Sequence, residues 1–178
     1  MLNLNRALIL MLCTPRRAQA AAAFLARNRR HLPRTYGINI AVSPGVNDLD
    51  QGEREIREAV GFFVNMNVIP SWFTLNLSCP NTEDDPGANQ TEEQARRFCA
   101  AALDVIGQRA PLWIKLSPEL APEQYAALMR VAVETGVKAI IATNTLAQPT
   151  PDDPKISAGM AGGRLHASAS KSVTHLLQ

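Results

Sequence analysis

Short apolar runs recur along the chain at a spacing of one strand plus one helix, and this recurrence limits the possible folds more than any other feature of the sequence. The runs begin near residues 37, 72, 112 and 138, and stretches with helical periodicity separate them. Each run is short and continuous rather than alternating, which is typical of strands covered on both faces. The sequence therefore predicts an α/β fold, a parallel sheet with helices outside it.

The pattern predicts the following elements. Strands are expected at 37–42, 72–77, 112–116 and 138–142, with a fifth near 8–12. Helices are expected at 15–30, 50–66, 91–108 and 122–135, and a last helix at the C-terminus. Thr14, Asp50 and Thr91 are the expected N-caps, and Gly136 is the expected C-terminal cap. Residues 144–163 are expected to form a long polar loop, and no linker divides residues 1–178 into two domains.

Composition excludes several classes of protein. The chain has 178 residues, of which 46% are hydrophobic and 19% charged, an ordinary globular mixture. Its wholly apolar runs are much shorter than the roughly 20 residues that a membrane-spanning helix needs. A net charge of +2 gives no reason to expect nucleic acid. The three cysteines and three histidines show no metal-binding spacing, and so few cysteines suit a reducing, cytoplasmic compartment.

Two architectures fit a parallel sheet of this kind, a doubly wound open sheet and a TIM barrel. No G-x-G-x-x-G motif follows the first long strand, which weakens the dinucleotide-binding version of the open sheet. Polar residues gather in or just after the strands, where a TIM barrel has its active site. A complete barrel takes about 250 residues and eight strands. The chain is therefore expected to form about the middle half of a barrel.

The segment 76–82, Asn-Leu-Ser-Cys-Pro-Asn-Thr, carries the strongest chemical signal. Cys79 leaves a buried strand into a Pro-Asn turn, and Asn76 and Asn81 flank it with hydrogen-bond donors and acceptors. A cysteine held in this way can act as a nucleophile or as a base toward a carbon acid. The alternative is a small buried cysteine that only packs at the end of a strand.

Other polar residues in apolar strands are further candidates. Lys115 lies within an apolar run, where a lysine needs an anionic partner unless the strand is at an edge and the side chain points to solvent. Asn39 is likewise an amide in an apolar strand. Thr143, Asn144 and Thr145 end the fourth strand, an arrangement that turn chemistry alone also explains.

The glycines of the segment 159–163, Gly159 and Gly162 among them, would let the backbone approach a phosphate or a flat ring, or would simply form a flexible turn. Cys13 and Cys99 lie in apolar surroundings and are interpreted as structural. No metal site is expected.

Taken together, these segments resemble the dihydroorotate dehydrogenase family. Residues 76–82 are the most specific match, and residues 114–118 (Ile-Lys-Leu-Ser-Pro) look like the family's flavin-contacting strand. Residues 142–145, 37–40 and 159–162 resemble its substrate-binding strand end, its G-[IV]-N-[IL] strand and its G-L-S-G loop. The resemblance covers about residues 36–165, and the dipeptide Asn5-Arg6 extends it toward the N-terminus.

The resemblance implies an FMN-binding TIM barrel that oxidises dihydroorotate to orotate in pyrimidine biosynthesis, here without the first and last barrel strands. Cys79 would be the catalytic base. The implied substrate-binding residues are Asn5, Asn76, Asn81, Asn144 and Thr145. The implied flavin-binding residues are Asn39, Asn76, Lys115, Thr143, Gly159 and Gly162.

The resemblance leaves the electron acceptor open among a quinone, fumarate and NAD. The quinone-linked class usually carries serine at the position of Cys79, whereas Thr82 and Asn5-Arg6 look more like that class. A quinone-linked enzyme would lie at a membrane surface, and a homo-oligomer is compatible with either class.

Two other functions fit parts of the sequence. Flavin barrels that reduce uridine in tRNA share an N-x-x-C-P core, and the arginine-rich, acid-free start of the chain would suit RNA. In those enzymes a glycine usually precedes the cysteine, where this chain has Ser78. The second alternative is a non-catalytic half-barrel whose exposed strand edges make it prone to association.

Overall fold

A computed structural model describes residues 8–12, 14–78, 91–118, 120–150, 152–153 and 155–177. Its elements follow one another in this order: β1 (Leu8–Leu12), α1 (Pro15–Arg27), a 3₁₀ turn η1 (Arg29–His31), β2 (Tyr36–Ile40), α2 (Leu49–Asn65), β3 (Trp72–Asn76), α3 (Glu92–Ile106), β4 (Leu112–Leu116), α4 (Pro122–Thr135), β5 (Ala139–Ala142), β6 (Leu146–Pro149), β7 (Ser157–Met160), η2 (Gly162–Leu165) and α5 (His166–Leu176).

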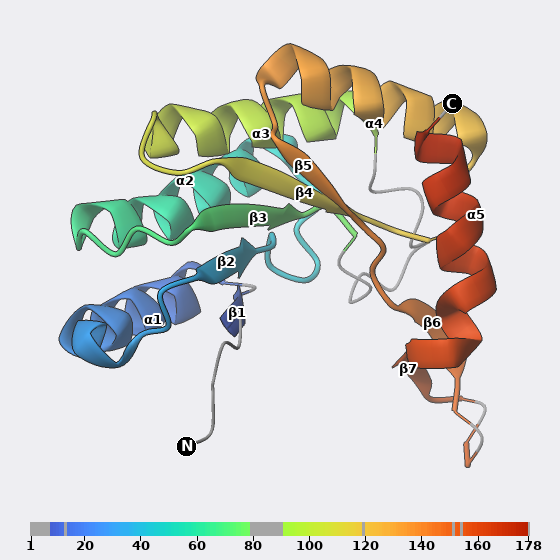
Figure 1. The fold of residues 1–178 in the computed structure, drawn as a ribbon, viewed down its shortest axis with the longest axis horizontal. Coiled ribbons are helices and arrows are strands. Elements are labelled where there is room, and N and C mark those ends of the chain that lie inside the picture. The colour runs from blue at the N-terminus through green and yellow to red at the C-terminus, as the bar shows by residue number, and fades with distance from the viewer. Residues whose placement is uncertain are drawn as a thin grey trace.

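The main sheet has five parallel strands in the sequential order β1-β2-β3-β4-β5. Helices α1 to α4 follow one another along one side of this sheet (Figure 1), and their buried faces form a single core with the strand residues that point toward them. A doubly wound sheet would instead carry helices on both faces. The expected TIM-barrel architecture is therefore confirmed for the described part of the chain, and the strand expected near residues 8–12 is present as β1.

Alternation along the strands separates two faces of the sheet. In β4, Leu112, Ile114 and Leu116 belong to the core under the helices, whereas Trp113 and Lys115 point to the other side. The strand register extends this second set across the sheet. We call it the inner face, and it consists of Gly37, Asn39, Trp72, Thr74, Asn76, Trp113, Lys115, Ala139 and Ile141.

The helix ends follow local sequence signals with one correction. The Thr14 and Thr91 side chains accept hydrogen bonds from the N–H groups of the first turns of α1 and α3, and Gly136 ends α4 in the left-handed region with φ 86°. The expectation that Asp50 caps α2 is wrong. Asp48 is the N-cap and accepts from Gln51 N at 2.6 Å, because the helix begins one residue before Asp50.

The expected polar loop at 144–163 is also corrected. Strands β6 and β7 within it form an antiparallel hairpin, with Leu146 opposite Met160 and Pro149 opposite Ser157. Sequence patterning missed these strands because they carry few β-branched or aromatic residues and gain their pairing from the backbone. The turn side of the hairpin has the polar chemistry that predicted a loop, since Thr150 Oγ1 donates to the Asp153 carbonyl at 2.7 Å.

In the described ranges, no helix combines the length and the apolar character needed to cross a bilayer.

Candidate functional site

The carboxyl ends of β3 and β4 bring two of the expected site residues together. Asn76 and Lys115 are register partners on neighbouring strands, so both point to the inner face. Strand β4 is paired on both sides, with β3 and with β5. Lys115 therefore does not lie on an edge strand, as the solvent-facing alternative required, and its side chain is half-buried.

Ser78 connects Asn76 to the rest of the site. Its backbone N–H and its hydroxyl both donate to Asn76 Oδ1, at 3.3 and 3.1 Å. A backbone N–H can only donate, so this contact identifies the oxygen of the Asn76 amide and fixes which way the amide faces. Asn76 and Ser78 are both buried. Sequence reasoning assigned Ser78 no role, although it stands inside the recognised segment.

Asn144 ties this network to β5. Its Nδ2 donates to the Ser78 carbonyl at 2.5 Å, and its backbone N–H donates to the Leu116 carbonyl at 2.8 Å. Asn144 thus joins the end of β5 to its two neighbours in different ways: its buried side-chain amide contacts the end of β3, and its backbone N–H contacts the end of β4. Ser78 is the last described residue before Cys79. Cys79, Asn81 and Asn5, together with Thr82, lie outside the described residues.

Glycine 159 has a packing reason to lack a side chain. A Cβ at this position would lie 2.6 Å from Thr145 Oγ1, far inside normal contact distance. Gly159 on β7 therefore makes room for the Thr145 side chain, which comes just before β6. Thr143 Oγ1 donates to the Asn144 carbonyl at 3.1 Å, and Gly162 adopts a left-handed φ of 72° at the start of η2. Both Gly159 and Gly162 are exposed.

The inner face also contains buried polar atoms, and sequence reasoning singled out Asn39 among them but neither Trp72 nor Thr74. Among the described residues, Asn39 Oδ1, Trp72 Nε1 and Thr74 Oγ1 are buried without a hydrogen-bond partner. Trp72 and Trp113 stack, with ring centroids 4.5 Å apart and an interplanar angle of 12°. Thr74 and Trp72 precede Asn76 by two and four residues, so the alternation of β3 was the signal that could have found them.

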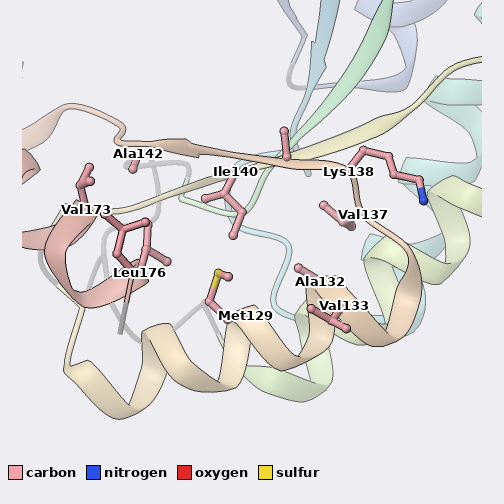
Figure 2. A pocket seen from close by; sticks show the side chains of 11 residues that line it. Met129, Ala132, Val133, Val137, Lys138, Ile140, Ala142, Val173 and Leu176 are labelled. Carbon is pink, nitrogen blue, oxygen red and sulfur yellow. The ribbon is translucent and has the colours of Figure 1, made fainter.

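An apolar groove of about 480 Å³ lies on the opposite side of the sheet, between α4, α5 and β5 (Figure 2). Its lining is Met129, Ala132, Val133, Val137, Lys138, Ala139, Ile140, Ala142, Val173, Leu176 and Leu177. Apart from Lys138, these side chains are apolar, and nearly all come from the helical layer or the helix-facing side of β5. The groove therefore lacks the polar groups that the inner face provides.

The Cys99 thiol lies in the hydrophobic core under the helices and not on the inner face. Burial raises the pKa of the Cys99 thiol on α3 to about 12, which keeps it protonated at neutral pH and supports its structural interpretation. Over the described ranges, no group of three or more histidine, cysteine, aspartate or glutamate side chains could hold a metal ion.

These features define a class, the α/β barrel proteins, in which ligand sites lie at the carboxyl ends of the parallel strands. Residues 18–178 match the family model described as dihydroorotate dehydrogenase. The chain belongs to this family.

Curated relatives agree with the family assignment. The chain is 34% identical over 129 residues to a dihydroorotate dehydrogenase (quinone) of Leifsonia xyli and 30% identical over 132 residues to one of Anaeromyxobacter sp.. These alignments cover 72% and 71% of this chain but only 36% of each relative. The chain thus spans little more than a third of the relatives' length.

Solved structures show the same fold. A ligand-free DHODH from Eimeria tenella superposes with a TM-score of 0.68 at 23% identity, over 91% of this chain and 49% of that one. A complex of the Eimeria tenella DHODH with ferulenol gives the same TM-score at 24% identity.

Proposed function

We propose that this chain carries the flavin-ring and substrate half of a dihydroorotate dehydrogenase, which oxidises dihydroorotate to orotate with FMN. The observation that carries the proposal is the network of Asn76, Ser78 and Asn144 beside Lys115. It lies at the carboxyl ends of the strands and leads directly into Cys79. A rigid polar network at that point is suited to orienting a small polar ring.

The residues of the inner face fit a flavin ring. Asn39 Oδ1 is a buried acceptor without a described partner, which suits a ring N–H, and the Lys115 ammonium suits the electron-rich edge of a flavin. Asn39, Asn76, Lys115 and Thr143 would hold the ring, and we propose that Gly159 and Gly162 approach the cofactor from the segment after β5. FMN, when bound, supplies the hydride acceptor.

The protein would supply a base and fixed dipoles. Cys79 Sγ would take the proton from C5 of dihydroorotate, and the hydride would leave C6 for the flavin, so that the C5–C6 double bond of orotate forms. Asn5, Asn76, Asn81, Asn144 and Thr145 would hold the substrate ring and its carboxylate. The tether from Asn144 to Ser78 supports this arrangement because it fixes the backbone immediately before Cys79.

We propose a quinone as the electron acceptor, because the relatives named above are quinone-type enzymes. Membership of the dihydroorotate dehydrogenase family also favours dihydroorotate over uridine in tRNA as the substrate.

The test uses the full chain reconstituted with FMN, and measures FMN binding and orotate formation with a soluble quinone. Cys79→Ala should retain FMN but lose about 100- to 10,000-fold in the rate of dihydroorotate oxidation, the usual cost of removing a general base. Cys79→Ser should keep part of the activity with a higher pH optimum, because a hydroxyl ionises less readily than a thiol.

Cys99→Ala is the matched control, since this thiol lies in the helical layer, and it should oxidise dihydroorotate at the parent rate. Parent-like activity of Cys79→Ala would contradict the role of Cys79. A chain that neither binds FMN nor forms orotate would be the non-catalytic half-barrel.

A further inference from the structure

Unpartnered polar atoms are concentrated on the inner face. Of the four buried side-chain polar atoms without a hydrogen-bond partner in the described part of the chain, three belong to Asn39, Trp72 and Thr74. All three residues are at least nine-tenths buried. Buried polar groups in proteins almost always have a partner, and leaving one unmade costs free energy. Three such atoms in one place therefore point to a ligand.

The strand register makes the three residues neighbours. Asn39 on β2 is the register partner of Thr74 on β3, and both point to the inner face. Trp72 precedes Thr74 by two residues on the same face and is the register partner of Gly37. Its Nε1 lies 2.5 Å from where a Cβ at Gly37 would be. The indole N–H thus lies over Gly37, next to Asn39 along β2.

The indole is held in place from its other side. Trp113 stacks on Trp72 and is also the register partner of Thr74. The lack of a side chain at Gly37 is what admits the Trp72 ring, because any Cβ there would overlap it. The three polar atoms are therefore preorganised on strands and do not depend on a loop.

The donor and acceptor pattern specifies the ligand chemistry. Trp72 Nε1 only donates, Asn39 Oδ1 only accepts, and Thr74 Oγ1 does either. A donor, an acceptor and a second donor are complementary to a cyclic imide, in which an N–H lies between two carbonyl groups. We propose that Asn39, Thr74 and Trp72 bind the imide edge of a ring, namely C2=O, N3–H and C4=O of the flavin.

This inference rests on the proposed function and adds Thr74 and Trp72 to its ring-contacting residues. Orotate and dihydroorotate contain the same imide, so the experiment must distinguish the cofactor from the substrate.

The chain offers a direct readout of this site. Its only two tryptophans are Trp72 and Trp113, so intrinsic tryptophan fluorescence reports on the stack alone. The full chain is titrated with FMN, with N3-methyl-FMN and with orotate. FMN should quench the emission. N3-methyl-FMN should bind with a Kd about tenfold or more above that of FMN, because methylation removes the N–H group that donates a hydrogen bond to Asn39 Oδ1.

The substitution Thr74→Val is nearly isosteric and should raise the Kd for FMN about five- to tenfold. The Kd for N3-methyl-FMN, which is already raised in the parent protein, should change little in this variant. Thr74→Ser should restore most of the affinity. Thr135→Val is the control, because Thr135 lies at the end of α4 and donates to the Val131 carbonyl, away from the inner face. Trp72→Phe should weaken FMN binding to a similar extent, read from flavin fluorescence.

The outcomes separate the two proposals. Equal affinity for FMN and N3-methyl-FMN, or no effect of Thr74→Val on FMN binding, would overturn the imide site even if dihydroorotate oxidation depends on Cys79. Quenching by orotate but not by FMN, abolished by Thr74→Val, would keep the imide site and reject the flavin as its ligand. Tryptophan fluorescence that changes with neither FMN nor orotate would overturn the inference.

Discussion

The side-chain amide of Asn144 donates a hydrogen bond to the backbone carbonyl of Ser78, and so joins the ends of β5 and β3 across β4. Ser78 in turn donates twice to Asn76 Oδ1. The orientation of Asn76 and the position of the Ser78 backbone therefore depend on Asn144, which follows Ser78 by 66 positions.

Removing the Asn144 tether should lower the rate of dihydroorotate oxidation strongly and change the affinity for flavin only slightly. In Asn144→Ala, we expect kcat for dihydroorotate oxidation to fall by about 100-fold, because small displacements of a catalytic group have effects of this size. The Kd for FMN should change less than threefold. Steady-state kinetics and flavin fluorescence measure the two quantities. Asn65→Ala, on the exposed end of α2, should leave both unchanged, and a parent-like kcat for Asn144→Ala would show that the tether is dispensable.

Replacing Lys115 should change the electronic properties of the flavin. A cation on the inner face stabilises negative charge that develops on reduction, so Lys115→Met should lower the reduction potential of the bound flavin. It should also weaken flavin retention. Spectroelectrochemical titration measures the potential. Lys138→Met is the control, because Lys138 is exposed outside the sheet and lines the groove of Figure 2. Equal potentials in the parent and Lys115→Met would place the ring away from Lys115.

Two glycines of the same helix should respond to alanine in opposite directions. A Cβ at Gly52 would lie 2.5 Å from the Phe98 ring on α3, whereas one at Gly61 would meet nothing within 4 Å. Gly52→Ala should therefore cost about 1–3 kcal/mol of unfolding free energy through overpacking. Gly61→Ala should gain about 0.5–1 kcal/mol, since alanine favours the helix. Urea denaturation measures both, and a stabilised Gly52→Ala would mean that α2 and α3 separate easily.

The buried Cys99 thiol should make the chain less stable in alkali. Its pKa of about 12 in the folded state lies above the ordinary value of 9.0 expected in the unfolded chain. Its contribution to stability is therefore complete below about pH 9 and is lost as the pH rises toward 12, because only the unfolded state releases the proton in that range.

Thermal unfolding between pH 8 and 11 tests this dependence, which Cys99→Ala should reduce. Iodoacetamide at pH 8 should label Cys99 only after unfolding. Rapid labelling of Cys99 in the folded protein would contradict the burial that raises its pKa.

The sequence determined much of the layout. Strands β2 to β5 and helices α1 to α4 lie close to their expected positions, because short apolar runs, helical periodicity and caps such as Thr91 and Gly136 are local signals. Motifs that a family shares are also local, and for this reason residues 76–82 and 114–118 pointed to the family that the comparison with known proteins found.

Only the tertiary structure decided which of these residues meet. Alternation within a strand separates its two faces, but it does not say which strand lies beside which or in what register. That register puts Thr74 beside Asn39, Trp72 over Gly37 and Lys115 beside Asn76. The hairpin β6–β7 and the tether between Asn144 and Ser78 likewise depend on contacts between distant segments. The chemistry of the site thus depends on strand register and on contacts between distant segments, which the local sequence signals do not specify.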